Sequence, residues 1–173
     1  GWHVNYIAGL GTDFGIWEIG VPTSGPATNS AGWRAHAGTN CAATILAGNY
    51  PDDRTARLES PLFMVPAADQ MPRLRFWHWW SFNYGDYGQV TISTNNGASW
   101  QALSDRYGEV DLTYNYWSGG QWTRAWLDLT AYAGQTVRLG FYFYSSTAYG
   151  TRTDVGWYVD DFRIAASPSA AGP

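Results

Sequence analysis

Short stretches rich in β-branched and aromatic residues recur along the chain between turn-forming residues, while helical periodicity is nearly absent. Such spacing is typical of an antiparallel sandwich or barrel. The clearest predicted strands cover residues 74–82, 88–93, 122–129, 136–144 and 156–164. Asn and Gly tolerate positive φ, so tight turns are predicted at Asn95-Asn96-Gly97, Ser118-Gly119-Gly120 and Ala133-Gly134-Gln135.

Segment 137–144 shows the alternation most clearly, and segment 89–93 repeats it. Strand geometry sends successive side chains to opposite faces, so one face of segment 137–144 is apolar and the other is polar and aromatic. The apolar face holds Val137, Leu139, Phe141 and Phe143, and the other holds Arg138, Gly140, Tyr142 and Tyr144. This is the pattern of a half-buried antiparallel strand. Residues 128–134 are expected to form one short helical turn.

The 173 residues fit one domain, with 45% hydrophobic and 14% charged residues. We expect a single domain over 1–165 and an Ala/Ser/Pro/Gly tail or linker over 166–173. All ten basic residues are Arg and are scattered in sequence, and the net charge is −4, which argues against nucleic-acid binding. No apolar run is long enough for a membrane span. The single cysteine, Cys41, is expected to be a small buried residue.

An ordered set of motifs resembles a group of bacterial exported modules. The motifs are WEIGVP (17–22), GTN (38–40), GNYP (48–51), LESP (58–61), FWHW (76–79), VTISTNNGASW (90–100), DLTAYAGQ (128–135) and GWYVDD (156–161). The chain is similar to the MAM-like jelly-roll domain attached to immune inhibitor A-type metallopeptidases, and to the cleaved-adhesin modules of gingipains. Residues 5–15 depart from the pattern because they are rich in Gly, which leaves the pairing of the first strand open.

The resemblance implies an all-β, two-sheet antiparallel jelly-roll β-sandwich in an extracellular protein, either secreted or on the cell surface. It also implies tethering to a larger secreted enzyme and a structural calcium ion. It says less about the ligand, because modules of this kind occur beside proteases, glycosidases and adhesins.

Asp160 is the first candidate metal ligand. If Phe162 and Ile164 face the core, simple alternation places Asp160 on the inward face as well. An inward carboxylate is costly unless it is paired or metal-bound, so we expect a Ca²⁺ ligand here, with Glu18 and Asn40 as weaker partners. The alternative is that Asp160 pairs with an Arg or accepts backbone N–H groups.

Aromatic residues make up 17% of the chain, with 11 Trp and 12 Tyr. Exposed rings can stack on the apolar faces of sugars while polar neighbours hydrogen-bond the hydroxyl groups. The candidate ligand-binding residues lie in predicted loops and have no core face to fill: Trp117, Tyr116, Tyr84 and Tyr87. The alternative for any single ring is that it packs in the core or covers a sheet.

No catalytic residue is predicted. His3, His36 and His78 show no metal-binding spacing, and neither a serine-nucleophile elbow nor a phosphate loop is present. We therefore expect a non-enzymatic, calcium-stabilised binding module whose partner is a glycan or a protein surface, with no nucleic acid and no membrane insertion. Carbohydrate binding is the first hypothesis. The alternative is a protein-interaction or protease-associated, adhesin-like domain that packs on its parent enzyme.

Overall fold

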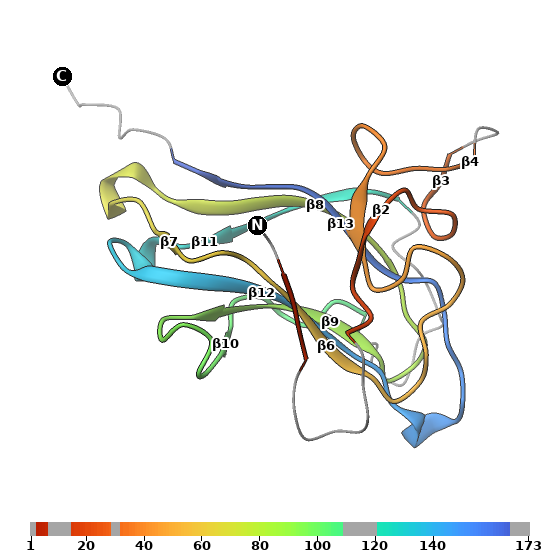
Figure 1. The fold of residues 1–173 in the computed structure, drawn as a ribbon. Helices are drawn as coiled ribbons and strands as arrows, with labels where there is room; N and C mark the ends of the chain where they lie inside the picture. The colour runs from red at the N-terminus through yellow and green to blue at the C-terminus, as the bar shows by residue number, and fades with distance from the viewer. Residues whose placement is uncertain (1–2, 7–14, 29–31, 109–120, 167–173) are drawn as a thin grey trace.

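A computed structural model describes residues 3–6, 15–28, 32–108 and 121–166, and these form two antiparallel sheets stacked face to face (Figure 1). The predicted all-β, two-sheet sandwich is confirmed. The six-stranded sheet has the order β1 (His3–Tyr6), β6 (Thr55–Glu59), β12 (Thr136–Tyr144), β9 (Tyr87–Ser93) and β10 (Gln101–Ala102), with β7 (Phe63–Met64) pairing the start of β12.

The five-stranded sheet has the order β11 (Thr123–Asp128), β8 (Arg73–Ser81), β13 (Gly156–Ala165), β5 (Cys41–Ala43) and β2 (Glu18–Gly20). A separate pair is formed by β3 (Ala27–Thr28) and β4 (Gly32–Trp33). Three short 3-10 helices complete the described part of the chain: η1 (Ala68–Gln70), η2 (Thr130–Tyr132) and η3 (Thr147–Tyr149). No helix in this part is long and apolar enough to cross a membrane.

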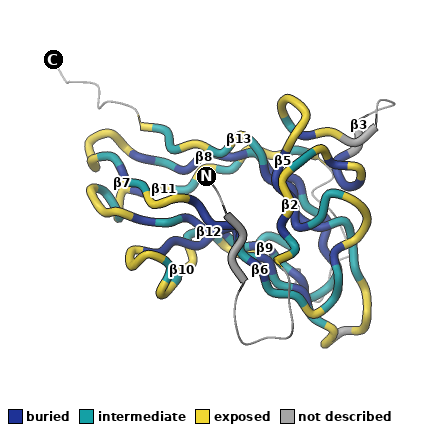
Figure 2. Tube along the Cα trace, viewed as in Figure 1, coloured by how far each residue is buried: buried dark blue, intermediate teal, exposed yellow. Residues whose placement is uncertain are grey.

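The core lies between the two sheets, where the strands are most deeply buried (Figure 2). The predicted apolar face of β12 is confirmed, because its side chains are at most 1% exposed: Val137, Leu139, Phe141 and Phe143. Trp157 of β13 is the largest fully buried side chain. Gly88 of β9 makes room for it, since a Cβ atom at Gly88 would lie 2.5 Å from the indole ring. Sequence alternation therefore sets the face of each central strand, and small residues accommodate the largest rings.

A second apolar cluster covers one end of the outer face of the five-stranded sheet, formed by Ala35, Cys41, Ala43, Trp79 and Tyr158. The Tyr158 hydroxyl lies 2.9 Å from the hydroxyl of Ser24, a residue in the loop between β2 and β3. This contact holds that loop against the five-stranded sheet. Cys41 is buried, as expected, and burial raises the pKa of its thiol to about 12. The thiol is thus protonated at neutral pH and behaves as a small apolar group.

Candidate functional site: an aromatic row on the six-stranded sheet

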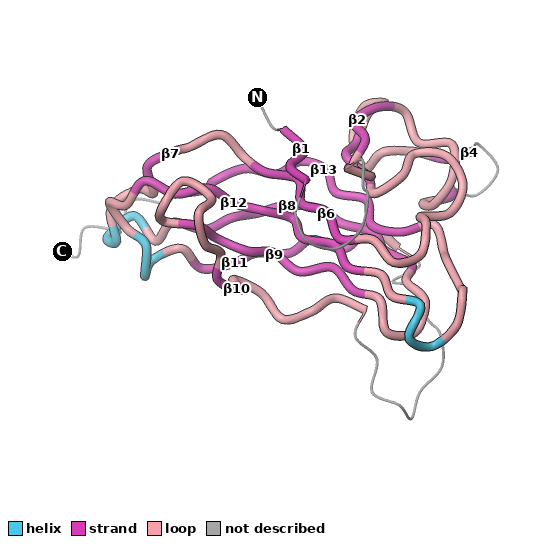
Figure 3. Tube along the Cα trace, turned by 60° about the horizontal axis from the view of Figure 1, so that its bottom comes forward, coloured by secondary structure: helices cyan, strands magenta, loops and turns pink. Residues whose placement is uncertain are grey.

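The outer face of the six-stranded sheet, in which β12 and β9 run side by side (Figure 3), carries three neighbouring tyrosines. Tyr142 and Tyr144 occupy outward positions of β12, and Tyr87 begins β9 directly opposite Tyr144. The rings of Tyr87 and Tyr144 stack with centroids 5.1 Å apart, and those of Tyr87 and Tyr142 are 6.0 Å apart. All three side chains are half-buried. We call Tyr87, Tyr142 and Tyr144 the tyrosine row.

Arg57 and Trp100 extend the aromatic face beyond the tyrosine row. The Arg57 guanidinium lies 5.2 Å from the ring centroid of Tyr142 and 4.3 Å from that of Trp100, which are cation–π distances. Its aliphatic stem crosses Gly140, where a Cβ atom would lie 2.4 Å from Arg57 Cδ. Gly140 is therefore the gap that lets a long side chain lie flat on the sheet.

The row combines flat rings with neutral hydroxyl groups. Burial is the main cause that raises the pKa of Tyr87 to about 12, and the neighbouring Tyr142 adds to it. The Tyr87 hydroxyl is therefore protonated at neutral pH and can both donate and accept hydrogen bonds. Arg106 lies 4.2 Å above the Tyr87 ring and brings a cation to the same end of the face. Stacking surfaces and hydrogen-bonding groups thus lie together on a sheet face.

The loop that leads into Tyr87 is held by a buried network. The Tyr50 hydroxyl donates to Asp86 Oδ2 at 2.6 Å and accepts from the Asn83 N–H at 2.8 Å. Asp86 Oδ1 accepts the Ser146 N–H at 2.9 Å. Burial raises the pKa of the Asp86 carboxyl to about 6 despite these hydrogen bonds. The network fixes the start of β9 and with it the position of Tyr87.

The structure brings only part of the predicted ligand set to this face. Tyr87 belongs to the tyrosine row, although it begins a strand rather than lying in a loop. Tyr84 is half-buried in the adjoining loop. Tyr116 and Trp117 lie outside the described residues, so their role stays a prediction. Alternation along β12 had placed Tyr142 and Tyr144 outward, whereas the contact of Arg57 with Trp100 depends on strand register and was missed.

The predicted inward position of Asp160 is wrong. Asp160 pairs with Trp77 of β8, and pairing resumes only with Arg163 opposite Arg75, so two residues of β13 face one residue of β8. This β-bulge contains Asp161, whose φ is 51°. The extra residue reverses the alternation. Phe162 and Ile164 pack on the core, as expected, while Asp160 lies on the outer face.

The carboxylate of Asp160 accepts two backbone hydrogen bonds, from the Ala37 N–H at 3.0 Å and from the Asp161 N–H at 2.8 Å. These contacts match the alternative considered for Asp160. Glu18 Oε2 accepts the Leu46 N–H at 2.7 Å, and Asn40 is exposed. Within the described ranges, no group of three or more His, Cys, Asp or Glu side chains is arranged to hold a metal ion. Calcium binding therefore stays a prediction.

Comparison with known proteins supports the architecture. No known protein-family profile matches the chain. It is 29% identical over 157 residues to bacillopeptidase F of Bacillus subtilis (strain 168), a match that covers 90% of this chain and 10% of that protein. The K1 cleaved-adhesin domain of Lys-gingipain from Porphyromonas gingivalis W83 is similar with a TM-score of 0.54 and 18% identity, covering 96% of this chain and 90% of that chain.

The K2 cleaved-adhesin domain of Lys-gingipain is similar with a TM-score of 0.52 and 14% identity, covering 95% of this chain and 89% of that chain. These likenesses confirm the predicted resemblance to gingipain modules at the level of the fold. The chain spans only 10% of the length of its curated relative. Similarity to the MAM-like and immune inhibitor A-type domains stays a prediction.

Proposed function

We propose that the chain is a non-catalytic binding module that holds a polysaccharide against the tyrosine row. The observation that carries the proposal is the side-by-side arrangement of half-buried Tyr87, Tyr142 and Tyr144 on an outer sheet face. Half-exposed rings offer stacking area at low entropic cost, because each ring has only two side-chain torsions to fix. The tyrosine hydroxyls and the Arg106 guanidinium supply hydrogen bonds to sugar hydroxyls.

The proposal includes an extracellular parent protein, to which the domain is tethered as an accessory. Supporting it are the match to a short part of bacillopeptidase F and the structural likeness to two cleaved-adhesin domains of a gingipain. A module of this kind keeps a parent enzyme near its substrate and raises the local concentration. A structural calcium ion belongs to the proposal as well.

A polysaccharide retention assay tests the tyrosine row. The domain is applied to a panel of neutral insoluble and soluble polysaccharides, together with Tyr142→Ala and Tyr87→Ala. We expect one polysaccharide to retain the wild type and to bind each variant up to about tenfold more weakly, since an aromatic contact is worth about 0.5–1.5 kcal/mol. Retention should survive roughly 0.5 M salt, because stacking and neutral hydrogen bonds are weakly screened.

Trp126→Ala is the matched control, since Trp126 is an exposed ring on the opposite sheet. It should bind the neutral polysaccharide like the wild type. Unchanged retention of both tyrosine variants would exclude the tyrosine row. If only Trp117→Ala and Tyr84→Ala lose binding, the ligand instead contacts the loop residues that were predicted from the sequence.

The second candidate function is docking to a protein surface, and the edge of the five-stranded sheet favours it. Edge strand β2 and its flank expose Ile19 at 61% and Val21 at 57%. An exposed apolar edge strand is a template for strand pairing with another chain. If no glycan is retained while Ile19→Ser and Val21→Ser abolish association with the remainder of the parent protein, docking is the function.

A further inference from the structure

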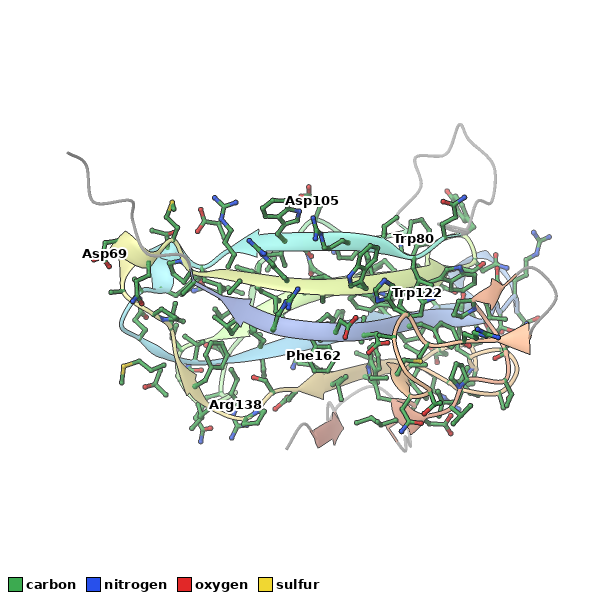
Figure 4. All side chains as sticks on the ribbon, turned by 90° about the horizontal axis from the view of Figure 1, so that it is seen from above. Asp69, Trp80, Asp105, Trp122, Arg138 and Phe162 are labelled. Atoms are coloured by element: carbon green, nitrogen blue, oxygen red, sulfur yellow. The ribbon has the colours of Figure 1, made fainter. Side chains whose placement is uncertain are left out.

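Strand register brings four arginines together on the outer face of the five-stranded sheet. Figure 4 looks onto this face, with β11, β8 and β13 side by side. Leu74 and Phe76 of β8 face the core. Arg73 and Arg75 alternate with them along the strand and therefore point outward. Arg124 of β11 is opposite Trp77, and Arg163 of β13 is opposite Arg75.

An exposed tryptophan lies at the centre of these charges. Trp126 of β11 is opposite Arg75 and is 50% exposed. The guanidinium groups of Arg75, Arg73 and Arg124 lie 5.1, 5.5 and 5.6 Å from its ring centroid. We call Trp126 and these arginines, with Arg163, the arginine–tryptophan face. One indole ring is thus flanked by three guanidinium groups at cation–π distances.

The charges of this face are only partly balanced by carboxylates, since Asp128 interacts electrostatically with Arg73. Among the described residues, none of the four guanidinium groups forms a salt bridge. The nearest acid by register is Asp128, opposite Arg73, but its Oδ1 already accepts both the N–H and the hydroxyl of Thr130. Like charges directly opposite each other, as in Arg75 and Arg163, are unfavourable. An anion bound between them would remove that repulsion.

A cleft opens beside two arginines of this face, Arg73 and Arg75. Its lining combines two guanidinium groups with the apolar side chains of Met71 and Ala165, next to the end of β13. Met71 is 49% exposed, and Nε of Arg75 is buried without a hydrogen-bond partner. The cleft therefore presents cationic walls beside an apolar surface, which suits a group that is both ring-shaped and anionic.

We propose that the arginine–tryptophan face binds an acidic polysaccharide, with a carboxylate or sulfate group held by the arginines and a sugar ring stacked on Trp126. Planar guanidinium groups bind carboxylates and comparable oxyanions in a bidentate manner. A half-exposed indole offers a large flat apolar surface on which a sugar ring can stack. This second site is distinct from the tyrosine row and does not depend on it. It lies on the other sheet, on the opposite side of the sandwich.

Affinity electrophoresis tests the proposal with three polymers: polygalacturonate for carboxylates, dextran sulfate for sulfates, and uncharged dextran. We expect at least one acidic polymer to retard the wild type while dextran does not. The double variant R75Q/R124Q should weaken that retardation by about tenfold or more, because it removes two charge-assisted contacts. The charge-matched control is R34Q/R152Q, which lies outside this face and should stay within about twofold of the wild type.

Trp126→Ala separates a sugar site from plain charge attraction. It leaves the net charge unchanged and should still lower the affinity several-fold, while Tyr142→Ala should not. Raising the salt from about 0.05 M to about 0.5 M should weaken binding of the acidic polymer but not of a neutral ligand at the tyrosine row. Melting midpoints of all variants confirm that each is folded.

Three results would overturn the proposal. One is that neither acidic polymer retards the wild type. Another is that R34Q/R152Q loses as much affinity as R75Q/R124Q, which would show dependence on total charge alone. The third is that a DNA duplex binds at least as tightly as the acidic polymers and that its binding is unaffected by Trp126→Ala, which would reveal a non-specific polyanion-binding surface. None of these results bears on neutral-glycan binding at the tyrosine row.

Discussion

His78 is a histidine enclosed by aromatic rings in the core. Its ring centroid lies 4.7 Å from that of Tyr107 and 5.2 Å from that of Phe76, and the Trp157 indole N–H lies 3.4 Å from His78 Nδ1. Burial lowers the pKa of the imidazole to about 4. His78 is therefore neutral at pH 7 and fills core volume.

The lowered pKa of His78 predicts a loss of stability in acid. The unfolded chain binds a proton at His78 below about pH 6.5, while the folded chain resists it until about pH 4. The stabilisation is complete above pH 6.5 and is lost as the pH falls through this window, by on the order of 3 kcal/mol at most. His78→Phe should therefore lose less of its melting midpoint than the wild type between about pH 7 and about pH 4.5.

The pH dependence of the wild type alone does not isolate His78, because Asp86 changes the stability with pH in the opposite direction. Its carboxyl pKa is raised to about 6, so its contribution is present in acid and is lost as the pH rises toward 6. Asp86→Asn in the background of each protein isolates the His78 effect. Parallel midpoint curves for the wild type and His78→Phe would show that the imidazole titrates normally.

At the scale of elements, the sequence predicted the long central strands well. The alternation along β12 predicted its bounds and its faces, and η2 forms within the helical turn expected at 128–134. Asn96 and Gly97 both adopt positive φ, as expected for the turn after β9. The short strands β2, β3, β4, β7 and β10 carry too few residues for alternation to identify them.

The candidate sites were less predictable because they depend on register between strands. The outward direction of Tyr142 follows from β12 alone, but its contact with Arg57 requires the pairing of β12 with β6. Arginines that are scattered in sequence converge only when β8, β11 and β13 are aligned. A single inserted residue at Asp161 reversed the face of Asp160, and strict alternation contains no signal for it.

Calcium dependence is tested at the β13 bulge. We predict that EDTA lowers the melting midpoint and that Ca²⁺, but not Mg²⁺, restores it, since a ligand that binds only the native state stabilises it. Asp160→Asn should abolish this response, and the exposed Asp128→Asn should keep it. A midpoint that EDTA leaves unchanged would assign Asp160 solely to its hydrogen bonds with the Ala37 and Asp161 N–H groups.

At the scale of the whole molecule, the two outer faces of the sandwich differ in chemistry. The six-stranded sheet presents stacked tyrosines, and the five-stranded sheet presents arginines around Trp126. The core between them is closed by aromatic packing around Trp157. Such a sandwich could bind a neutral chain on one side and an acidic chain on the other, so a single small domain could cross-link a mixed polysaccharide surface.

The last prediction is that the domain is catalytically silent. Hydrolysis of a glycosidic bond needs two carboxyl groups flanking an open site, roughly 5–9 Å apart, and both must be available to the substrate. Two aspartates that are buried or half-buried are already engaged: Asp86 with Tyr50 and Ser146, and Asp154 with Ser81 and Val155.

Each of these carboxylates accepts hydrogen bonds that hold a loop in place. Using one as a general acid or base would break those hydrogen bonds and destabilise the loop. Incubation with the retained polysaccharides and with casein should therefore release neither reducing ends nor peptides. The prediction fails if turnover persists through repurification but disappears in Asp86→Asn or Asp154→Asn variants that still melt cooperatively. That result would show that the domain contains an active site. Retention without turnover is the outcome expected of a domain whose side chains stack and pair but transfer no proton.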